Sequence, residues 1–270
     1  MLYIATVHHR SARWIEIQAR YLREHIPVEH QTWTSLEGID PSYGVHFDRV
    51  ISQSGPHPGK LNHLALEIAQ VARAEDLLMF LDGDAFPIAN PMGLIEESLR
   101  RAPLMAVRRA ENADFPQPHP CFCVTTVGTW ADLAGDWSRG PTWTGANGTP
   151  VSDVGANLMR RLEIANTPWV EVLRSNPAEL DPLHFAIYGG VVYHHGAAFR
   201  QIGALSDAHR ARAPRRLRRR NPLLRAFDPV LNPLRWKRWE RAEKQRLVSE
   251  SERMYLAISS GGEGWLERIS

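Results

Sequence analysis

Long hydrophobic runs are missing from this chain of 270 residues, in which no apolar stretch reaches the length of about 18 residues that a membrane-spanning helix needs. The apolar stretch at residues 2–7 is too short, and too soon followed by histidine and arginine, to be a signal peptide. Cysteine is scarce: Cys121 and Cys123 are the only two, and their spacing suits neither a disulfide nor the usual Cys-x-x-Cys zinc arrangement. We therefore expect a cytoplasmic protein with two reduced, packing cysteines.

Three common catalytic signatures are missing as well. The chain has no Walker A loop, no Gly-x-Gly-x-x-Gly after its first strand-like stretch, and no Ser-His-Asp order typical of hydrolases. The sequence therefore gives no reason to expect a P-loop nucleotidase, a dinucleotide-binding dehydrogenase or a serine hydrolase.

An even spread of charge is also missing, although the formal net charge is only +2. Residues 210–246, here called the basic segment, carry 14 Lys and Arg against three acids, whereas the rest of the chain carries 18 against 27. A mildly acidic body with such a segment is typical of proteins that meet a polyanionic partner or surface.

The apolar residues of the basic segment narrow the choice of partner, because Leu, Phe and Trp interleave with its arginines. This mixture is typical of segments that lie on an anionic membrane surface, and we expect peripheral docking on the inner face of a bacterial-type membrane. A basic helical appendage packed on the acidic body of the same chain is the alternative. Nucleic acid is disfavoured, because the rest of the chain is net negative and shows no base-reading module.

Strand-like and helix-like patterns alternate over the first hundred-odd residues of a chain that is 43% hydrophobic. This alternation predicts an α/β fold with a doubly wound, mostly parallel sheet flanked by helices. Helices are expected to start near Ser11, Lys60, Asn90 and Ser152 or Asp153. The expected strands are residues 2–7, 29–34, 45–51, 77–82, 104–107, 122–126, 169–173 and 190–194.

Residues 76–86 are the most informative stretch, because a short apolar run there ends abruptly at two carboxylates, Asp82 and Asp84. A run of this kind predicts a buried central strand, and ligands of open α/β sheets lie at the carboxyl ends of such strands. The two carboxylates can turn toward one hard divalent cation, while Gly83 lets the backbone approach a phosphate. The pattern suggests metal-bridged diphosphate binding, with a plain Asp-Gly turn as the simpler alternative.

Three further places carry candidate side chains. Lys60 adjoins a glycine at an expected helix start, where backbone amides and the helix dipole favour an anion, although a solvated surface lysine fits equally. Asp153 is expected as a helix cap, and the same carboxylate could serve as a general base. His194 and His195 lie at a strand end, where neighbours point to opposite faces, so we expect at most one to share a site with the carboxylates. Each histidine alone could also be structural.

Taken in order, these features resemble a GT-A type nucleotide-sugar glycosyltransferase. The motifs that carry the resemblance are residues 4–9, the Lys60 helix, residues 81–86 as the DxD element, the helix start at 153–157, and residues 193–196. The resemblance implies a GT-A catalytic domain at residues 1–205, with a nucleotide-sugar half at 1–110 and an acceptor half at 111–205. Residues 206–270 would form a basic helical C-terminal extension.

The resemblance implies that Asp82 and Asp84 bind Mn²⁺ or Mg²⁺ across the diphosphate of a nucleoside-diphosphate sugar, with Gly83 against the phosphates. One of His194 and His195 would complete the metal shell. We expect His195, because it lies closer to the glycine turn and so to the open strand end.

Other positions match the family's remaining parts. By resemblance, Thr6 and His8 lie near the base or ribose, and Lys60 lies near the phosphates. Asp153 is similar to the acid that deprotonates the acceptor hydroxyl in inverting members, which is the expectation here. Asn157, four residues later, is similar to a feature of retaining members, and so the stereochemistry stays open.

The implied activity is a metal-dependent hexosyl transfer to the hydroxyl of a glycan, lipid-linked or natural-product acceptor. Two alternatives belong to other classes. Haloacid-dehalogenase-like phosphatases also place Asp-x-Asp after an apolar strand, but near the amino terminus and with Thr or Val following, whereas Ala85 follows here. The second alternative is a non-catalytic protein that binds polyanions or membranes through the basic segment.

Overall fold

The computed structural model describes residues 1–109, 116–144, 150–177, 185–196, 213, 228–261 and 265. The chain divides into two compact units. The first, here called the α/β unit, comprises Met1–Pro177 and Ala186–His194, and the second, the C-terminal unit, comprises Ala178–Phe185 and His195–Ser270. The predicted domain boundaries at 110 and 205 lie outside the described residues.

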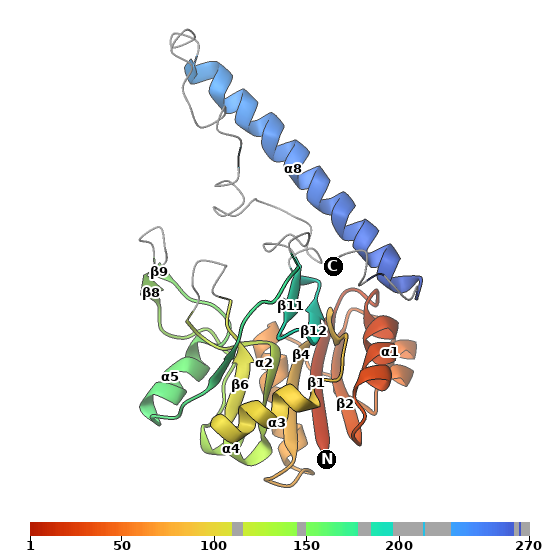
Figure 1. The fold of residues 1–270 in the computed structure, drawn as a ribbon, viewed down its shortest axis with the longest axis vertical. Helices are drawn as coiled ribbons and strands as arrows, with labels where there is room; N and C mark the ends of the chain where they lie inside the picture. Colours follow the sequence, from red (N-terminus) through yellow and green to blue (C-terminus); the bar gives the residue numbers. More distant parts are fainter. Residues whose placement is uncertain are drawn as a thin grey trace. The chain divides into compact units, whose positions relative to one another are not determined.

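A seven-stranded sheet runs through the α/β unit, in the order β10-β6-β7-β4-β1-β2-β3 (Figure 1). Its strands are β1 (Leu2–His9), β2 (His30–Glu37), β3 (Arg49–Val50), β4 (Leu77–Asp82), β6 (Leu104–Val107), β7 (His119–Thr126) and β10 (Val170–Val172). Neighbours among β4, β1, β2 and β3 pair parallel, as do β6 and β10, whereas β7 is antiparallel to both β4 and β6. The predicted mixed, mostly parallel sheet is confirmed.

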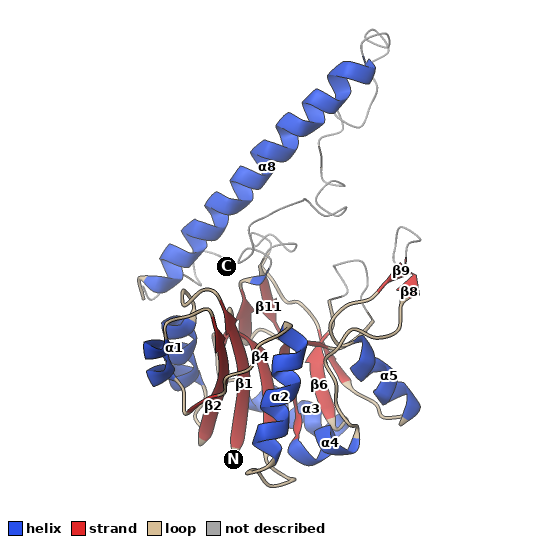
Figure 2. Cartoon of the chain, turned by 180° about the vertical axis from the view of Figure 1, so that it is seen from behind, coloured by secondary structure: helices blue, strands red, loops and turns tan. Residues whose placement is uncertain are grey.

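Helices cover both faces of this sheet. They are α1 (Ile15–His25), α2 (His57–Ala69), α3 (Met92–Arg101), α4 (Val127–Asp132) and α5 (Ala156–Ile164), with a 3₁₀ turn at Pro41–His46. Side chains alternate along a strand, so Tyr3 and Ala5 of β1 join the core under α2, while Leu2 and Ile4 join the core under α1 and α3. Figure 1 shows α3 in front of the sheet, and Figure 2, from behind, shows α2 there.

Helix α1 begins later than predicted, and helix α2 begins earlier than predicted. Ser11 does not cap α1, which begins at Ile15 after Trp14 without a side-chain cap bond. Helix α2 begins at His57, directly after Pro56, and so Lys60 is its fourth residue. A proline just before the first turn is favourable, because its fixed φ suits the helix entry.

Helix α5 starts later than predicted, and neither Ser152 nor Asp153 caps it. Its cap is Gly155, whose φ of 91° is left-handed. A Cβ at Gly155 would lie 2.0 Å from the carbonyl oxygen of Pro118, so only glycine fits this close approach. The chain therefore turns through residues 152–155 before it becomes helical.

Two small sheets lie beside the large one. Strands β11 (Ala186–Tyr188), β12 (Val192–His194) and β5 (Ala85–Pro87) form an antiparallel sheet in that order. In it His194 pairs with Ala85, which brings the end of β12 to the Asp-Gly-Asp turn. Strands β8 (Trp143–Thr144) and β9 (Pro150–Val151) form the second sheet, and residues 145–149 between them lie outside the described residues.

The C-terminal unit contains the long helix α8 (Asp228–Ser259), which carries Pro233 in its interior. Leu247 and Ile258 are buried within the protein. Residues 210–212 and 214–227 of the basic segment lie outside the described residues. Among the helices that the structure describes, none has the length and apolar character needed to cross a membrane.

Candidate functional site

The candidate site lies where β4 ends and the small sheet begins. Asp82 is the last residue of β4, Asp84 precedes β5, and His194 ends β12. Strand pairing alone brings these three together, because β12 runs antiparallel to β5 with His194 opposite Ala85. The predicted pair of carboxylates thus meets a histidine from more than a hundred residues later in the chain.

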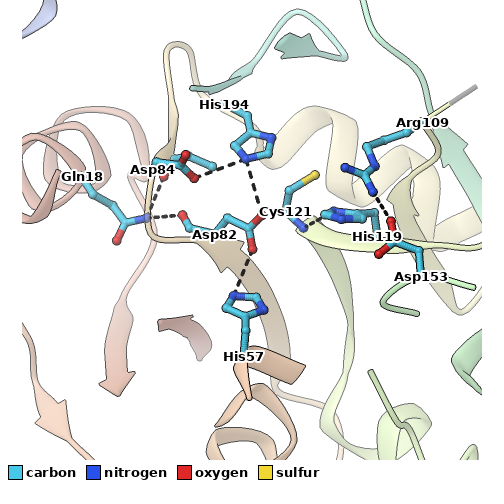
Figure 3. Close-up of polar contacts among 10 residues, drawn as sticks. Gln18, His57, Asp82, Asp84, Arg109, His119, Cys121, Asp153 and His194 are labelled. Carbon is cyan, nitrogen blue, oxygen red and sulfur yellow. Dashed lines mark hydrogen bonds and ion pairs between the residues drawn. The ribbon is translucent and has the colours of Figure 1, made fainter. Parts of the chain in front are cut away.

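The Asp82 carboxylate lies between two imidazole rings (Figure 3). His194 Nε2 is 3.5 Å from Asp82 Oδ2 and 3.3 Å from Asp84 Oδ1. On the other side, His57 Nε2 is 3.4 Å from Asp82 Oδ1. Sequence reasoning missed His57, whose only signal is its place at the start of α2, one turn before Lys60.

Cys121 completes a group that could hold a metal ion. Its Sγ, an Asp82 carboxylate oxygen and a His194 ring nitrogen all lie within 4.8 Å of one another. Asp82 Oδ1 is buried and has no hydrogen-bond partner. The contact with His57 at 3.4 Å is not a hydrogen bond, and a buried carboxylate without one is costly, so this carboxylate fits a site that takes a cation. Both cysteines are free, as predicted, and both are buried.

The charge state of the site follows from its burial and its carboxylates. Burial alone would lower the pKa of His194, but the charge of Asp84 and its hydrogen bond outweigh that and hold the pKa well above 6.5. His194 therefore carries a proton at neutral pH and partly neutralises Asp82 and Asp84. Burial raises the pKa of the Cys121 thiol, and His194 opposes that rise.

Gln18 of α1 holds the Asp-Gly-Asp turn in place. This fully buried side chain donates from Nε2 to the carbonyl oxygens of Asp82, at 2.9 Å, and Ala85, at 2.7 Å, which bracket the turn. Its Oε1 accepts from Thr6 Oγ1 at 3.2 Å and contacts His8 Nε2 at 3.1 Å. A polar residue on the buried stripe of an amphipathic helix was the signal that sequence reasoning overlooked.

Thr6 and His8 were expected near the base or ribose, but the structure buries both, with 0% and 4% exposed. Burial lowers the pKa of His8 from 6.5 to about 4, so its ring is neutral at neutral pH. Because Gln18 Oε1 can only accept, we assign the His8 proton to Nε2. Both side chains therefore support the turn through Gln18.

Gly83 is required by packing, whatever it does for a phosphate. A Cβ at this position would lie 2.5 Å from the carbonyl oxygen of Val7 and 2.8 Å from Nδ1 of His8. Backbone and a buried ring cannot move aside cheaply, and so the turn can approach the end of β1 only with glycine.

We expect Gly83→Ala to lower the free energy of unfolding by about 1–3 kcal/mol, the usual cost of overpacking. Gly93→Ala is the matched control, because a Cβ at Gly93 in α3 meets nothing within 4 Å. The control should be neutral or stabilise by up to about 1 kcal/mol. Urea unfolding of the two variants measures this, and equal stability of both would contradict the account.

Lys60 was expected to face phosphates, but it is buried, with 2% of its side chain exposed, in an ion pair with Glu37. Glu37 ends β2 and also accepts from His9 Nδ1 at 2.9 Å if that nitrogen is protonated. The hydrogen bond from Lys60 lowers the pKa of Glu37. As the structure places it, Lys60 is a structural cation that ties α2 to the carboxyl end of β2.

Asp153 has both carboxylate oxygens engaged. Oδ2 forms an ion pair with Arg109, and Oδ1 accepts from the Val154 backbone N–H at 2.8 Å. Figure 3 shows this pair on the far side of Cys121 and His119 from Asp82. An acceptor hydroxyl would therefore have to share an oxygen of Asp153 with one of these donors.

Asn157, the other end of the helix-start motif, binds a carboxylate in the neighbouring loop. Its Nδ2 donates to Asp136 Oδ2 at 3.0 Å, and Asn62 Nδ2 of α2 donates to Asp136 Oδ1 at 2.6 Å. Burial would raise the pKa of Asp136, but hydrogen bonds from Ser138, Asn62 and Asn157 outweigh that and lower it. Asn157 therefore anchors the loop that leads toward β8.

His195 does not take part in the carboxylate group. In the C-terminal unit its Nε2 bonds to Ser251 Oγ at 2.8 Å, and its ring packs against Phe185 with centroids 5.2 Å apart. The structure thus brings His194 to the carboxylates, and the expected preference for His195 is not followed. Proximity to a glycine was the wrong criterion, since the register of β12 against β5 decides which ring faces Asp84.

Comparisons with known proteins give fold-level likenesses. No protein-family model matches the sequence, and no curated protein matches it. Solved structures whose backbones are partly similar include S. aureus TarS 1-349, with a TM-score of 0.43 and 11% identity over 77% of this chain and 68% of that one. The galactosyltransferase LgtC, in complex with donor and acceptor sugar analogs, has a TM-score of 0.37 and 10% identity over 60% of this chain and 70% of that one.

A longer structure of S. aureus TarS gives a TM-score of 0.37 and 11% identity over 51% of this chain. This chain spans only 30% of that protein's length. Glycosyltransferases, the class that the motif order resembles, are thus among the solved structures of similar chain course. The likeness is partial and concerns the fold alone.

Proposed function

We propose that the α/β unit is a metal-dependent glycosyltransferase, which moves a sugar from a nucleoside-diphosphate sugar to a hydroxyl acceptor. The observation that carries the proposal is the contact of His194 with both Asp82 and Asp84 at the carboxyl end of β4. Ligands of open α/β sheets bind at this edge. The acceptor would be a glycan, a lipid-linked sugar or a natural product.

A cation is needed because a diphosphate would be repelled by two adjacent carboxylates. Asp82 and His194, with Asp84 beside them, would hold that divalent ion, for which the resemblance implies Mn²⁺ or Mg²⁺. The approach of His194 Nε2 to within 3.5 Å of Asp82 Oδ2 supports the fit. When bound, the ion would offset charge that develops on the departing nucleoside diphosphate.

The remaining residues would orient and support this site. Gln18 fixes the two carbonyls that bracket the Asp-Gly-Asp turn, which keeps both carboxylates in position before a ligand arrives. Thr6 and His8 hold Gln18, and they are positioning residues in this proposal. Lys60 would act on the phosphates only if its pair with Glu37 opened.

Turnover assays separate this function from its rivals. We expect release of nucleoside diphosphate from one nucleotide sugar, suppressed by EDTA, and no phosphate release from phosphomonoesters. Phosphate release from a monoester without any turnover of nucleotide sugars would instead support the phosphatase class.

Asp153 is proposed as the acceptor base of an inverting hexosyl transfer, with Arg109 orienting its carboxylate. Asp153→Asn keeps the side chain's size and an oxygen for the Val154 N–H, but removes the basicity. We expect turnover to fall by about 10²–10⁴-fold, the usual contribution of a general base, with unchanged affinity for the donor. Product anomeric configuration, read by NMR, should be inverted.

Arg109→Gln is the matched control for Asp153. If the carboxylate only anchors Arg109, this variant should lose as much activity as Asp153→Asn. Retained configuration in the product, or near-normal turnover of Asp153→Asn, would remove the base role.

Peripheral docking through the basic segment is proposed as well, near a lipid-linked or polysaccharide acceptor. Within α8, Trp236 and Trp239 pack edge to face, with centroids 5.5 Å apart. The basic residues around them in the sequence are Arg235, Lys237, Arg238 and Arg241. Aromatic and cationic side chains in one helix suit the interface of an anionic membrane.

Flotation with phosphatidylglycerol vesicles tests the docking. The full chain should float at low salt, less so as salt rises, and replacement of the four basic residues by Gln should reduce flotation more than Trp236→Ala does. Absence of binding to these vesicles at low salt would contradict the proposal.

A further inference from the structure

Cys121 points to the carboxylates because β7 is irregular. Ala106 of β6 lies opposite Cys123, but its neighbour Val107 lies opposite His119 where a regular ladder would place Phe122, so the register shifts between them. The Cys121 N–H donates to Nδ1 of His119 at 3.2 Å within this irregular stretch. Bulges re-aim side chains and are frequent next to active sites.

The result separates two cysteines that a regular strand would place on one face. Cys123 packs with Phe80 and Trp130 in the core under α2 and α4. Cys121 belongs to the opposite core, and its Sγ reaches Asp82 and His194. Both thiols are fully buried, so burial alone does not distinguish them. What distinguishes Cys121 is the pair of ligand-type atoms beside it.

The separations in this group suit one tetrahedral ion. Atoms bound to a single zinc ion at about 2.0–2.3 Å lie about 3.3–3.6 Å apart. His194 Nε2 and Asp82 Oδ2 are already 3.5 Å apart, and no ligand atom of the three is more than 4.8 Å from another. Side-chain rotations that move the ligand atoms by about 1 Å would bring all three within bonding distance of one ion.

We propose that Cys121 is a thiolate ligand of the cation together with Asp82 and His194, and that the site therefore selects zinc-like ions over Mn²⁺ and Mg²⁺. Thiolate and imidazole ligands favour zinc and cobalt, whereas Mn²⁺ and Mg²⁺ prefer sites built from oxygen alone. On binding, the Cys121 sulfur and the His194 ring nitrogen each donate a lone pair to the ion, and the proton that each group carries goes to solvent.

Three protein ligands leave a fourth position open, as in catalytic zinc sites. A diphosphate oxygen of the donor would fill that position, and to this extent the inference rests on the proposed function. His57 contacts Oδ1 of Asp82, which leaves Oδ2 to face His194 and the ion. An outer partner of this kind orients a ligating carboxylate.

Cobalt titration of the full chain tests the ligand directly, because thiolate bound to Co²⁺ gives a charge-transfer band in the near ultraviolet. We expect the band in the wild type and in Cys123→Ser, which keeps Cys121 as the only thiol. Cys121→Ser and Cys121→Ala should lack it while circular dichroism shows an intact fold. Zn²⁺ should displace Co²⁺ from the wild type, whereas Mn²⁺ should bind at least about 100-fold more weakly.

Cys121→Asp replaces the soft ligand by a hard one, and we expect it to reverse the preference toward Mn²⁺. Cobalt binding to the wild type without the band, a band that persists in Cys121→Ser, or no cobalt binding at all would each overturn the proposal. Calorimetric titration with nucleotide sugars distinguishes failure of the thiolate proposal from failure of the glycosyltransferase proposal. Cation-dependent donor binding without a thiolate band would overturn only the ligand role of Cys121. The band without any donor binding would overturn the glycosyltransferase proposal.

Discussion

Asp82→Asn and Asp84→Ala are expected to abolish cation-dependent turnover of the nucleotide sugar while the fold survives. Asp82 would be a direct ligand, and both carboxylates contact the ring of His194, so each change removes negative charge that the ion requires. A bound ion contributes several kcal/mol of transition-state stabilisation, which corresponds to a loss of roughly 10³-fold or more in kcat/KM.

Glu75→Gln is the control for these two variants, because it removes an exposed carboxylate just before the opposite, amino-terminal end of β4. It should leave turnover and cation dependence unchanged. Circular dichroism and urea unfolding check that the site variants are folded. Normal turnover of Asp84→Ala, or full wild-type activity in excess EDTA, would remove the metal bridge.

Alanine substitutions at the two adjacent histidines should have unequal effects. His194→Ala removes a ligand, and we expect cation affinity to fall by at least about 100-fold. His195→Ala removes the bond to Ser251 and should cost about 0.5–1.5 kcal/mol of stability, with cation affinity unchanged. Calorimetric titration with Zn²⁺ and Mn²⁺ measures the first effect, and urea unfolding the second.

Ser251→Ala provides the matched control, since it breaks the same hydrogen bond from the other side. It should reproduce the stability loss of His195→Ala and leave His194 untouched. Equal and mild effects of both histidine variants on cation binding would mean that both histidines have only structural roles.

The order of elements and the carboxylates at the end of β4 could be predicted because they depend on local patterns. An apolar run that stops at two acids is visible in the sequence itself, as is the alternation of strands and helices. The strand predicted at residues 45–51 shrank to Arg49–Val50, after a 3₁₀ turn, because an edge strand gets little support from neighbours.

The partners of the carboxylates could not be predicted, because tertiary pairing decides them. The register of β12 against β5 brings His194 to the carboxylates. An irregularity in β7 brings Cys121 there, and the earlier start of α2 brings His57. Gln18 is a buried polar residue whose acceptors lie more than sixty positions away. Spacing along the chain carries no information on contacts of this kind.

Metal-bridged binding of a nucleotide sugar is tested most directly by a thermal-shift screen of the wild type with UDP-, GDP-, CMP- and dTDP-sugars, with and without Zn²⁺, Mn²⁺ or Mg²⁺. At a free donor concentration about 100 times Kd, binding should add about 2.7 kcal/mol to the free energy of unfolding. We expect at least one nucleotide sugar to raise the Tm only when a divalent ion is present, and Asp82→Asn to lose this rise. A rise that is equally large in EDTA, or no rise with any donor and ion, would contradict metal-bridged binding.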